Sequence, residues 1–167
     1  MSGGLDVRQL LELVIRPTLA AIGLNGTAAQ QLVLGTAAVE SGLTYIRQLG
    51  KGPALGLWQM EPATYNSLWK DLLALPNRAG LRHAILELGP YVNHPAPARL
   101  ISDLALGAAM CRVRYLWDPH PLPAEDDLDG LAATWKRAYN TRLGAGTPEH
   151  FKRAWQRLIA PALGEAP

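Results

Sequence analysis

Apolar residues recur every three or four positions along most of this 167-residue chain, which is the spacing of one face of an α-helix. The pattern predicts helices over about residues 6–21, 27–41, 62–75, 78–87, 100–117, 128–138 and 147–159. Pro17 is expected to kink or end the first helix near Arg16, because proline has no backbone N–H to donate. Residues 42–57 depart from the pattern, and their glycines favour a loop with very short strands at most. We therefore expect an all-α fold, with at most a very small β element, in a single domain of about seven helices.

The composition sets limits on partners and compartment. The 16 basic and 14 acidic residues give a net charge of +2, which is too small to select nucleic acid or another anionic polymer. The one cysteine, Cys111, lies in an apolar helical run, so we expect a buried small hydrophobe without a disulfide partner. Residues 1–14 lack the basic start and apolar stretch of a secretory signal, and no apolar run is long enough to span a membrane. We expect synthesis in a cytoplasm without a signal peptide, and no membrane insertion.

Several kinds of functional site are not indicated by the sequence. The four histidines are scattered and lack the spacing of a zinc site, so neither a metal nor another cofactor is expected. The glycine-rich segment 50–56 lacks the Lys-Ser/Thr ending of a phosphate-binding loop. Basic residues between Lys136 and Arg157 fit a solvated helix face better than a nucleic-acid site. Ser41 has no nucleophile-elbow context, and its hydroxyl is expected to hydrogen-bond at a helix end.

Glu40 is the residue that the helical pattern leaves unexplained. It falls on a stripe of residues that should face the core, namely Leu32, Val33, Thr36 and Ala37. A carboxylate taken out of water is costly to ionise, so its pKa should rise and it should hold its proton near neutrality. Position near a helix end alone favours a capping or surface role, whereas a raised pKa is a property of catalytic proton donors.

Three ordered motifs begin at Glu40. They are Glu40-Ser41-Gly42, the run Gly56-Leu57-Trp58-Gln59-Met60 followed by Pro62 and Thr64, and Ala138-Tyr139-Asn140. Together they resemble the soluble lytic transglycosylase and goose-type lysozyme family over residues 28–146. The resemblance implies a lysozyme-like fold for a single domain over residues 1–167. Residues 1–25 would be an N-terminal helical extension, and the helix with Gly107 would be central. Two departures are a tryptophan at position 58, where the family usually has methionine, and three residues, 141–143, before the next glycine.

The same resemblance implies roles for the motif residues. The family cleaves the MurNAc–GlcNAc β-1,4 bond of peptidoglycan, so Glu40 would act as acid and base. The candidate substrate-binding residues are Gln59, Tyr139, Asn140, Trp58 and Ser41. Tyr139 would orient Glu40 or the sugar, and Asn140 would hold the backbone of its motif. Two plainer roles stay open: Gln59 could brace its own loop, and Tyr139 could be a core tyrosine with a bonded hydroxyl.

Lytic transglycosis needs one carboxyl, because the 6-hydroxyl of the muramic acid attacks its own anomeric carbon and leaves a 1,6-anhydro end. A hydrolysing muramidase is a variant of this hypothesis. The alternative is a non-catalytic structural or glycan-binding virion protein with a lysozyme-like fold. The expected partners are peptidoglycan glycan strands and other bacteriophage virion proteins. The expected setting is a bacteriophage product that is part of the virion or is released to the cell wall during infection.

Overall fold

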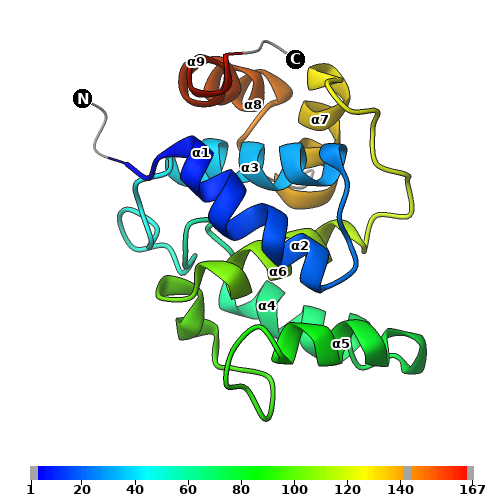
Figure 1. Ribbon diagram of the computed structural model, residues 1–167. Helices are drawn as coiled ribbons and strands as arrows, with labels where there is room; N and C mark the ends of the chain where they lie inside the picture. Colours follow the sequence, from blue (N-terminus) through cyan, green and yellow to red (C-terminus); the bar gives the residue numbers. More distant parts are fainter. Residues whose placement is uncertain (1–3, 141–143, 165–167) are drawn as a thin grey trace.

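The computed structural model describes residues 4–140 and 144–164, which are mostly helical and include no strand (Figure 1). Seven helical runs follow one another along the described residues, and four of them include a π-helical turn. The first run comprises α1 Val7–Gln9, the π-helical turn Leu10–Ile15 and α2 Arg16–Ala21, and the second is α3 Thr27–Ser41. The third is α4 Pro62–Ser67 with the π-helical turn Leu68–Leu72, the fourth is α5 Ala79–Leu86, and the fifth is α6 Leu104–Tyr115. The sixth is α7 Leu128–Thr134 with the π-helical turn Trp135–Asn140, and the last comprises α8 Pro148–Ala154, the π-helical turn Trp155–Ile159 and α9 Ala160–Leu163. Short 3-10 turns cover Pro76–Arg78 and Pro97–Ile101. The predicted all-α fold of about seven helices is confirmed.

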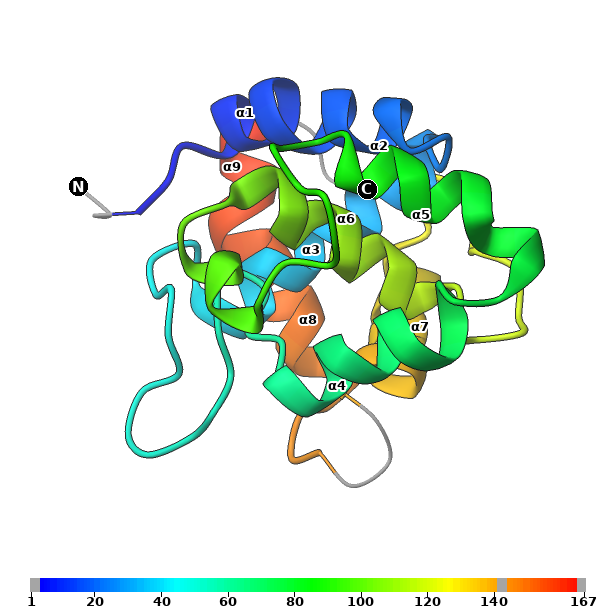
Figure 2. The same ribbon diagram turned by 90° about the horizontal axis from the view of Figure 1, so that it is seen from below.

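Helix α6 is the centre of the hydrophobic core, and residues 106–113 are all buried. It contacts α2, α3 and the π-helical ends of the α4 and α7 runs, and Figure 2 shows it between the first helical run and α4. Cys111 is buried there as a free thiol, as predicted. The helix begins at Leu104 and not near residue 100, because Asp103 caps it by accepting the backbone N–H of Leu106 at 2.9 Å. No helix in residues 4–140 or 144–164 has the length and apolarity to cross a membrane.

Pro17 was expected to kink or end the first helix near Arg16, and the helix does not end there. The chain stays helical through Pro17 to Ala21, and the preceding turn widens so that the N–H of Arg16 donates to the carbonyl of Leu11. A π-helical turn gives the proline ring more room against the preceding turn than an α-turn does, so the helix continues without a break. Leu10, Ile15 and other apolar residues of this run lie in the core. The N-terminal segment is therefore part of the packed fold.

The segment between α3 and α4, where very short strands at most were expected, forms isolated β-bridges and no strand. Isolated antiparallel bridges join Arg47 to Leu55 and Leu55 to Met60. A four-residue turn, residues 56–59, closes between the two backbone hydrogen bonds of Leu55 and Met60. Gly56 has a φ of +73° and lies so close to the carbonyl of Leu100 that a Cβ would approach it to 2.3 Å. A side chain at position 56 would therefore push this turn away from the core.

Candidate active site

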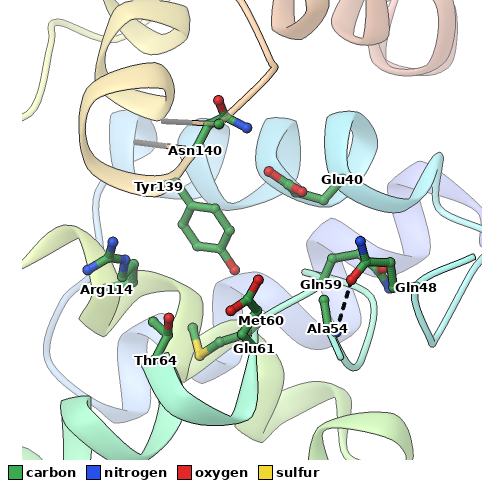
Figure 3. Close-up of a pocket in the computed structure, with 11 residues that line it drawn as sticks. Glu40, Gln48, Ala54, Gln59, Met60, Glu61, Thr64, Arg114, Tyr139 and Asn140 are labelled. Atoms are coloured by element: carbon green, nitrogen blue, oxygen red, sulfur yellow. Dashed lines mark hydrogen bonds between the residues drawn. The ribbon is translucent and has the colours of Figure 1, made fainter. Parts of the chain in front are cut away.

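A cleft of about 460 Å³ opens between the C-terminal end of α3, the 42–60 segment, α4 and the end of the α7 run (Figure 3). Most of the side chains that line it are polar. The lining residues are Glu40, Gln48, Ala54, Gln59, Met60, Glu61, Thr64, Arg114, Tyr139, Asn140 and Gly144. Four of the residues predicted from the motifs therefore meet in one place, namely Glu40, Gln59, Tyr139 and Asn140.

Glu40 sits in the last turn of α3 with its side chain partly buried. The helix ends directly after it because Gly42 adopts a left-handed conformation, with φ +59°, and donates to the carbonyl of Ala38. Burial raises the pKa of Glu40 to about 7, and a hydrogen bond from the indole of Trp135 opposes part of that rise. The predicted upward shift is therefore present, and it brings the pKa of Glu40 close to neutral pH.

Trp135 is the group that orients Glu40, and the motifs did not indicate it. Its Nε1 donates to Oε1 of Glu40 at 2.9 Å. Trp135 precedes Tyr139 by four residues, so both side chains lie on one face of the same helical run. The four-residue spacing could have identified Trp135 from the sequence, because a residue one helical turn before Tyr139 lies on the same side of the helix.

Tyr139 lines the cleft, but its hydroxyl donates to the backbone carbonyl of Trp58 at 2.8 Å. Burial raises the pKa of Tyr139 well above its usual range, so the phenol is a neutral donor. Its ring lies 5.5 Å from the ring of Tyr115, whose hydroxyl is 2.7 Å from Oγ1 of Thr36. Tyr139 thus holds the 56–59 turn against the core, and the bonded-tyrosine alternative describes its hydroxyl in this structure.

Gln59 projects from the same turn with a φ of +48°. Its Nε2 donates to the carbonyl of Gly56 at 2.8 Å, which braces the turn. The other amide atom, Oε1, has no hydrogen-bond partner among the described residues and belongs to a side chain that lines the cleft. Gln59 therefore combines both expected roles: one end stabilises the loop, and the other is available as an acceptor.

Trp58 and Ser41 are not placed to bind a substrate, and these two predictions need correction. Trp58 is 2% exposed, and its Nε1 donates to the carbonyl of Val33 at 2.9 Å. Its ring packs on Gly107 of α6, where a Cβ would lie 2.8 Å from Cε3. Ser41 is 3% exposed and donates to the carbonyl of Ala37 at 2.9 Å. Ser41 follows Glu40 on helix α3, and Trp58 precedes Gln59 in the turn. In each pair the first-named side chain faces the core, while Glu40 and Gln59 line the cleft.

Asn140 closes the side of the cleft formed by the α7 run. Its Oδ1 accepts from Nζ of Lys136 at 2.8 Å, and the same Nζ donates to the carbonyl of Gly144 at 2.7 Å. The departure from the family pattern after Asn140 falls on residues 141–143, which lie outside the described residues. Gly144 returns to the cleft, and Gly146 packs so closely on Trp135 that a Cβ would lie 2.5 Å from Cη2.

Glu61 is a second carboxylate on the cleft, and Arg114 is a cation at one end of it. Figure 3 shows Glu61 across the cleft from Glu40, at the start of α4. Arg114 was not among the predicted site residues, because it lies on the central helix and is far in sequence from every motif. In residues 4–140 and 144–164 no three His, Cys, Asp or Glu side chains gather where they could hold a metal ion.

No model of a protein family matches this chain, and neither a curated protein nor a solved structure does.

Proposed function

We propose that this protein cleaves the MurNAc–GlcNAc β-1,4 bond of peptidoglycan, with Glu40 as the catalytic acid and base. One observation carries the proposal: a carboxyl with a pKa of about 7 lies in a cleft lined by polar side chains. Cleavage of a glycosidic bond needs a proton on the leaving oxygen, and a carboxyl can supply it near neutrality only when its pKa is raised. The polar lining suits the hydroxyl and amide groups of a glycan.

The preferred outcome is lytic transglycosis, on the strength of the motif resemblance. Glu40 would first protonate the leaving oxygen and become a carboxylate. It would then accept the proton of the 6-hydroxyl as that oxygen attacks the anomeric carbon, which closes the 1,6-anhydro ring. The indole N–H of Trp135 would stabilise the carboxylate between the two steps, because hydrogen bonds to charged acceptors are the stronger kind.

Hydrolysis is the second candidate, and Glu61 is the observation that favours it. Most glycosidases use two carboxyl groups, one as the acid and one as a nucleophile or as the base that activates water. Glu61 is an exposed carboxylate on the same cleft as Glu40. In this variant Glu61 would be essential, whereas in lytic transglycosis it would be a dispensable lining residue.

The proposed setting is a bacteriophage product that acts on the cell wall, either from the virion or after release. The alternative of a glycan-binding virion protein without activity keeps the same cleft as a binding site. In such a protein the raised pKa of Glu40 would result from burial of the carboxyl and would have no catalytic role.

Digestion of purified peptidoglycan, with mass analysis of the muropeptides, tests these outcomes. Wild type, Glu40→Gln and Glu61→Gln should be compared at equal concentration. Anhydro ends made by wild type and Glu61→Gln, but not by Glu40→Gln, support transglycosis. Reducing ends that disappear in both variants support hydrolysis. Wild type that pellets with cell walls and releases nothing supports the binding protein, and full activity of Glu40→Gln would overturn the assignment of Glu40.

A further inference from the structure

A second surface hollow of about 460 Å³ adjoins the cleft, and we call it the Trp117 hollow. It is lined by Arg114, Trp117, Asp118, Pro119, His120, Arg137 and Ala138. Arg114 lines both the cleft and the Trp117 hollow, and Ala138 directly precedes Tyr139 of the cleft. Figure 3 shows Arg114 at one end of the cleft and Gln48 at the other, with Glu40 between them. The two hollows therefore meet at Arg114, at the end of the cleft away from Gln48.

Trp117 presents an aromatic ring to solvent in this hollow. It follows the end of α6 and is 41% exposed, whereas the other tryptophans of the described residues are buried. The guanidinium of Arg114 lies over its ring, with Cζ 5.9 Å from the centroid. A molecule that covers this ring would remove apolar surface from water, which is a gain in hydrophobic free energy.

Polar groups are fixed beside this ring by Asp118, whose side chain is only 6% exposed. Its Oδ2 accepts from Nε of Arg137 at 2.8 Å and from Nη2 at 2.6 Å. Its Oδ1 lies 2.6 Å from Nδ1 of His120. The carboxylate is thus fully engaged, while the side chains of Arg137 and His120 remain 41% and 61% exposed. A guanidinium and an imidazole held in fixed orientations provide hydrogen-bonding groups at little cost in side-chain entropy.

We infer that the Trp117 hollow is a distal sugar-binding site that extends the Glu40 cleft along the same glycan strand. An aromatic face that packs against the C–H face of a sugar ring, with fixed polar groups at its edge, is the chemistry that recognises a saccharide. This inference rests on the proposed function, because the ligand is a further part of the proposed substrate. It predicts that the protein binds long glycan strands more tightly than short ones.

Calorimetric binding with Glu40→Gln tests the inference without turnover. The probes are peptide-free peptidoglycan oligosaccharides, a tetrasaccharide and an octasaccharide. The octasaccharide should bind tighter, by on the order of tenfold, which is the size of one good aromatic contact. Adding Trp117→Ala should remove that gain and leave the tetrasaccharide affinity unchanged. Trp117→Phe should keep most of the gain because it keeps a ring, and Leu13→Ala, at an exposed position on the first helical run, should change nothing.

The outcomes separate this inference from the proposed function. If Glu40→Gln binds both oligosaccharides and Trp117→Ala keeps the preference for the longer one, the distal site is wrong and the cleft assignment stands. An equal loss for both lengths in Trp117→Ala also counts against a distal site. If Glu40→Gln binds neither oligosaccharide, the proposed substrate is wrong and the inference falls with it.

Discussion

The indole of Trp135 donates a 2.9 Å hydrogen bond to Glu40, a residue 95 positions earlier in the chain. The bond acts against the burial that raises the pKa of Glu40. Burial keeps the proton on the carboxyl before the reaction, and the indole stabilises the carboxylate once the proton has left. An acid that must also act as a base needs both properties, because its pKa must lie near the operating pH.

Replacement of Glu40 by glutamine should reduce kcat on peptidoglycan by about 10²- to 10⁴-fold, the usual contribution of a general acid or base. Glutamine keeps an acceptor for Trp135, so the circular dichroism spectrum should not change. Release of muropeptides, followed by chromatography, gives the rate. Glu87→Gln, at an exposed position outside the cleft, serves as the matched control and should retain wild-type activity.

The same substitution should stabilise the protein at alkaline pH. The pKa of Glu40 rises from 4.5 to about 7 on folding, so the folded state binds more protons than the unfolded state between these values. The free energy of unfolding of the wild type should therefore fall as pH rises from about 4.5 to 7, by about 3 kcal/mol. Glu40→Gln lacks this loss. Urea unfolding at pH 4.5 and pH 8 should show its advantage over wild type only at pH 8; an equal difference at both values would contradict the raised pKa.

Replacement of Trp135 by phenylalanine should shift the pH profile of kcat/KM. Loss of the indole N–H removes the group that lowers the pKa of Glu40, so the pKa should rise further. Because the reaction needs protonated Glu40, the alkaline limb of the profile should move to higher pH. Trp155→Phe is the matched control, since Trp155 is buried and its Nε1 has no hydrogen-bond partner among the described residues. That variant should leave the profile where it is.

Replacement of Tyr139 by phenylalanine distinguishes its two predicted roles. The hydroxyl bonds the carbonyl of Trp58, so its loss should cost about 1–3 kcal/mol of stability by leaving that carbonyl unpaired. Activity should fall because the turn that carries Gln59 loosens, while the pH profile stays in place. A displaced profile with unchanged stability would show instead that Tyr139 acts directly on Glu40.

Replacement of Gly107 by alanine should destabilise the protein by about 1–3 kcal/mol, since the new Cβ would lie 2.8 Å from the ring of Trp58. Displacement of Trp58 should also shift the turn that positions Gln59, so activity should fall with stability. Gly80→Ala in α5 is the control, because no atom of residues 4–140 or 144–164 lies within 4 Å of its Cβ position, apart from the neighbours in its own helix. That change should be neutral or stabilising, by up to about 1 kcal/mol. Thermal unfolding of the two variants gives the comparison.

Two of the residues that line the cleft, Glu40 and Gln59, could be predicted from local sequence alone. Glu40 falls on a buried helical stripe because helical periodicity fixes which residues share a face, and burial alone raises a carboxyl pKa. Gln59 lies in a short turn that begins at Gly56 and closes between the backbone hydrogen bonds of Leu55 and Met60. Trp58 and Ser41 were wrongly assigned to substrate because a motif gives the order of residues, and not the side of the turn that each one faces.

The sequence by itself determined the helices and the unusual state of Glu40, because these follow from spacing over a few turns. Only the tertiary structure decided that Trp135 meets Glu40 and that Tyr139 bonds the turn of Trp58. It also decided that Arg114 joins the cleft to the Trp117 hollow. Such contacts join residues far apart in the chain, and they depend on how whole helices pack against one another, which local periodicity does not specify.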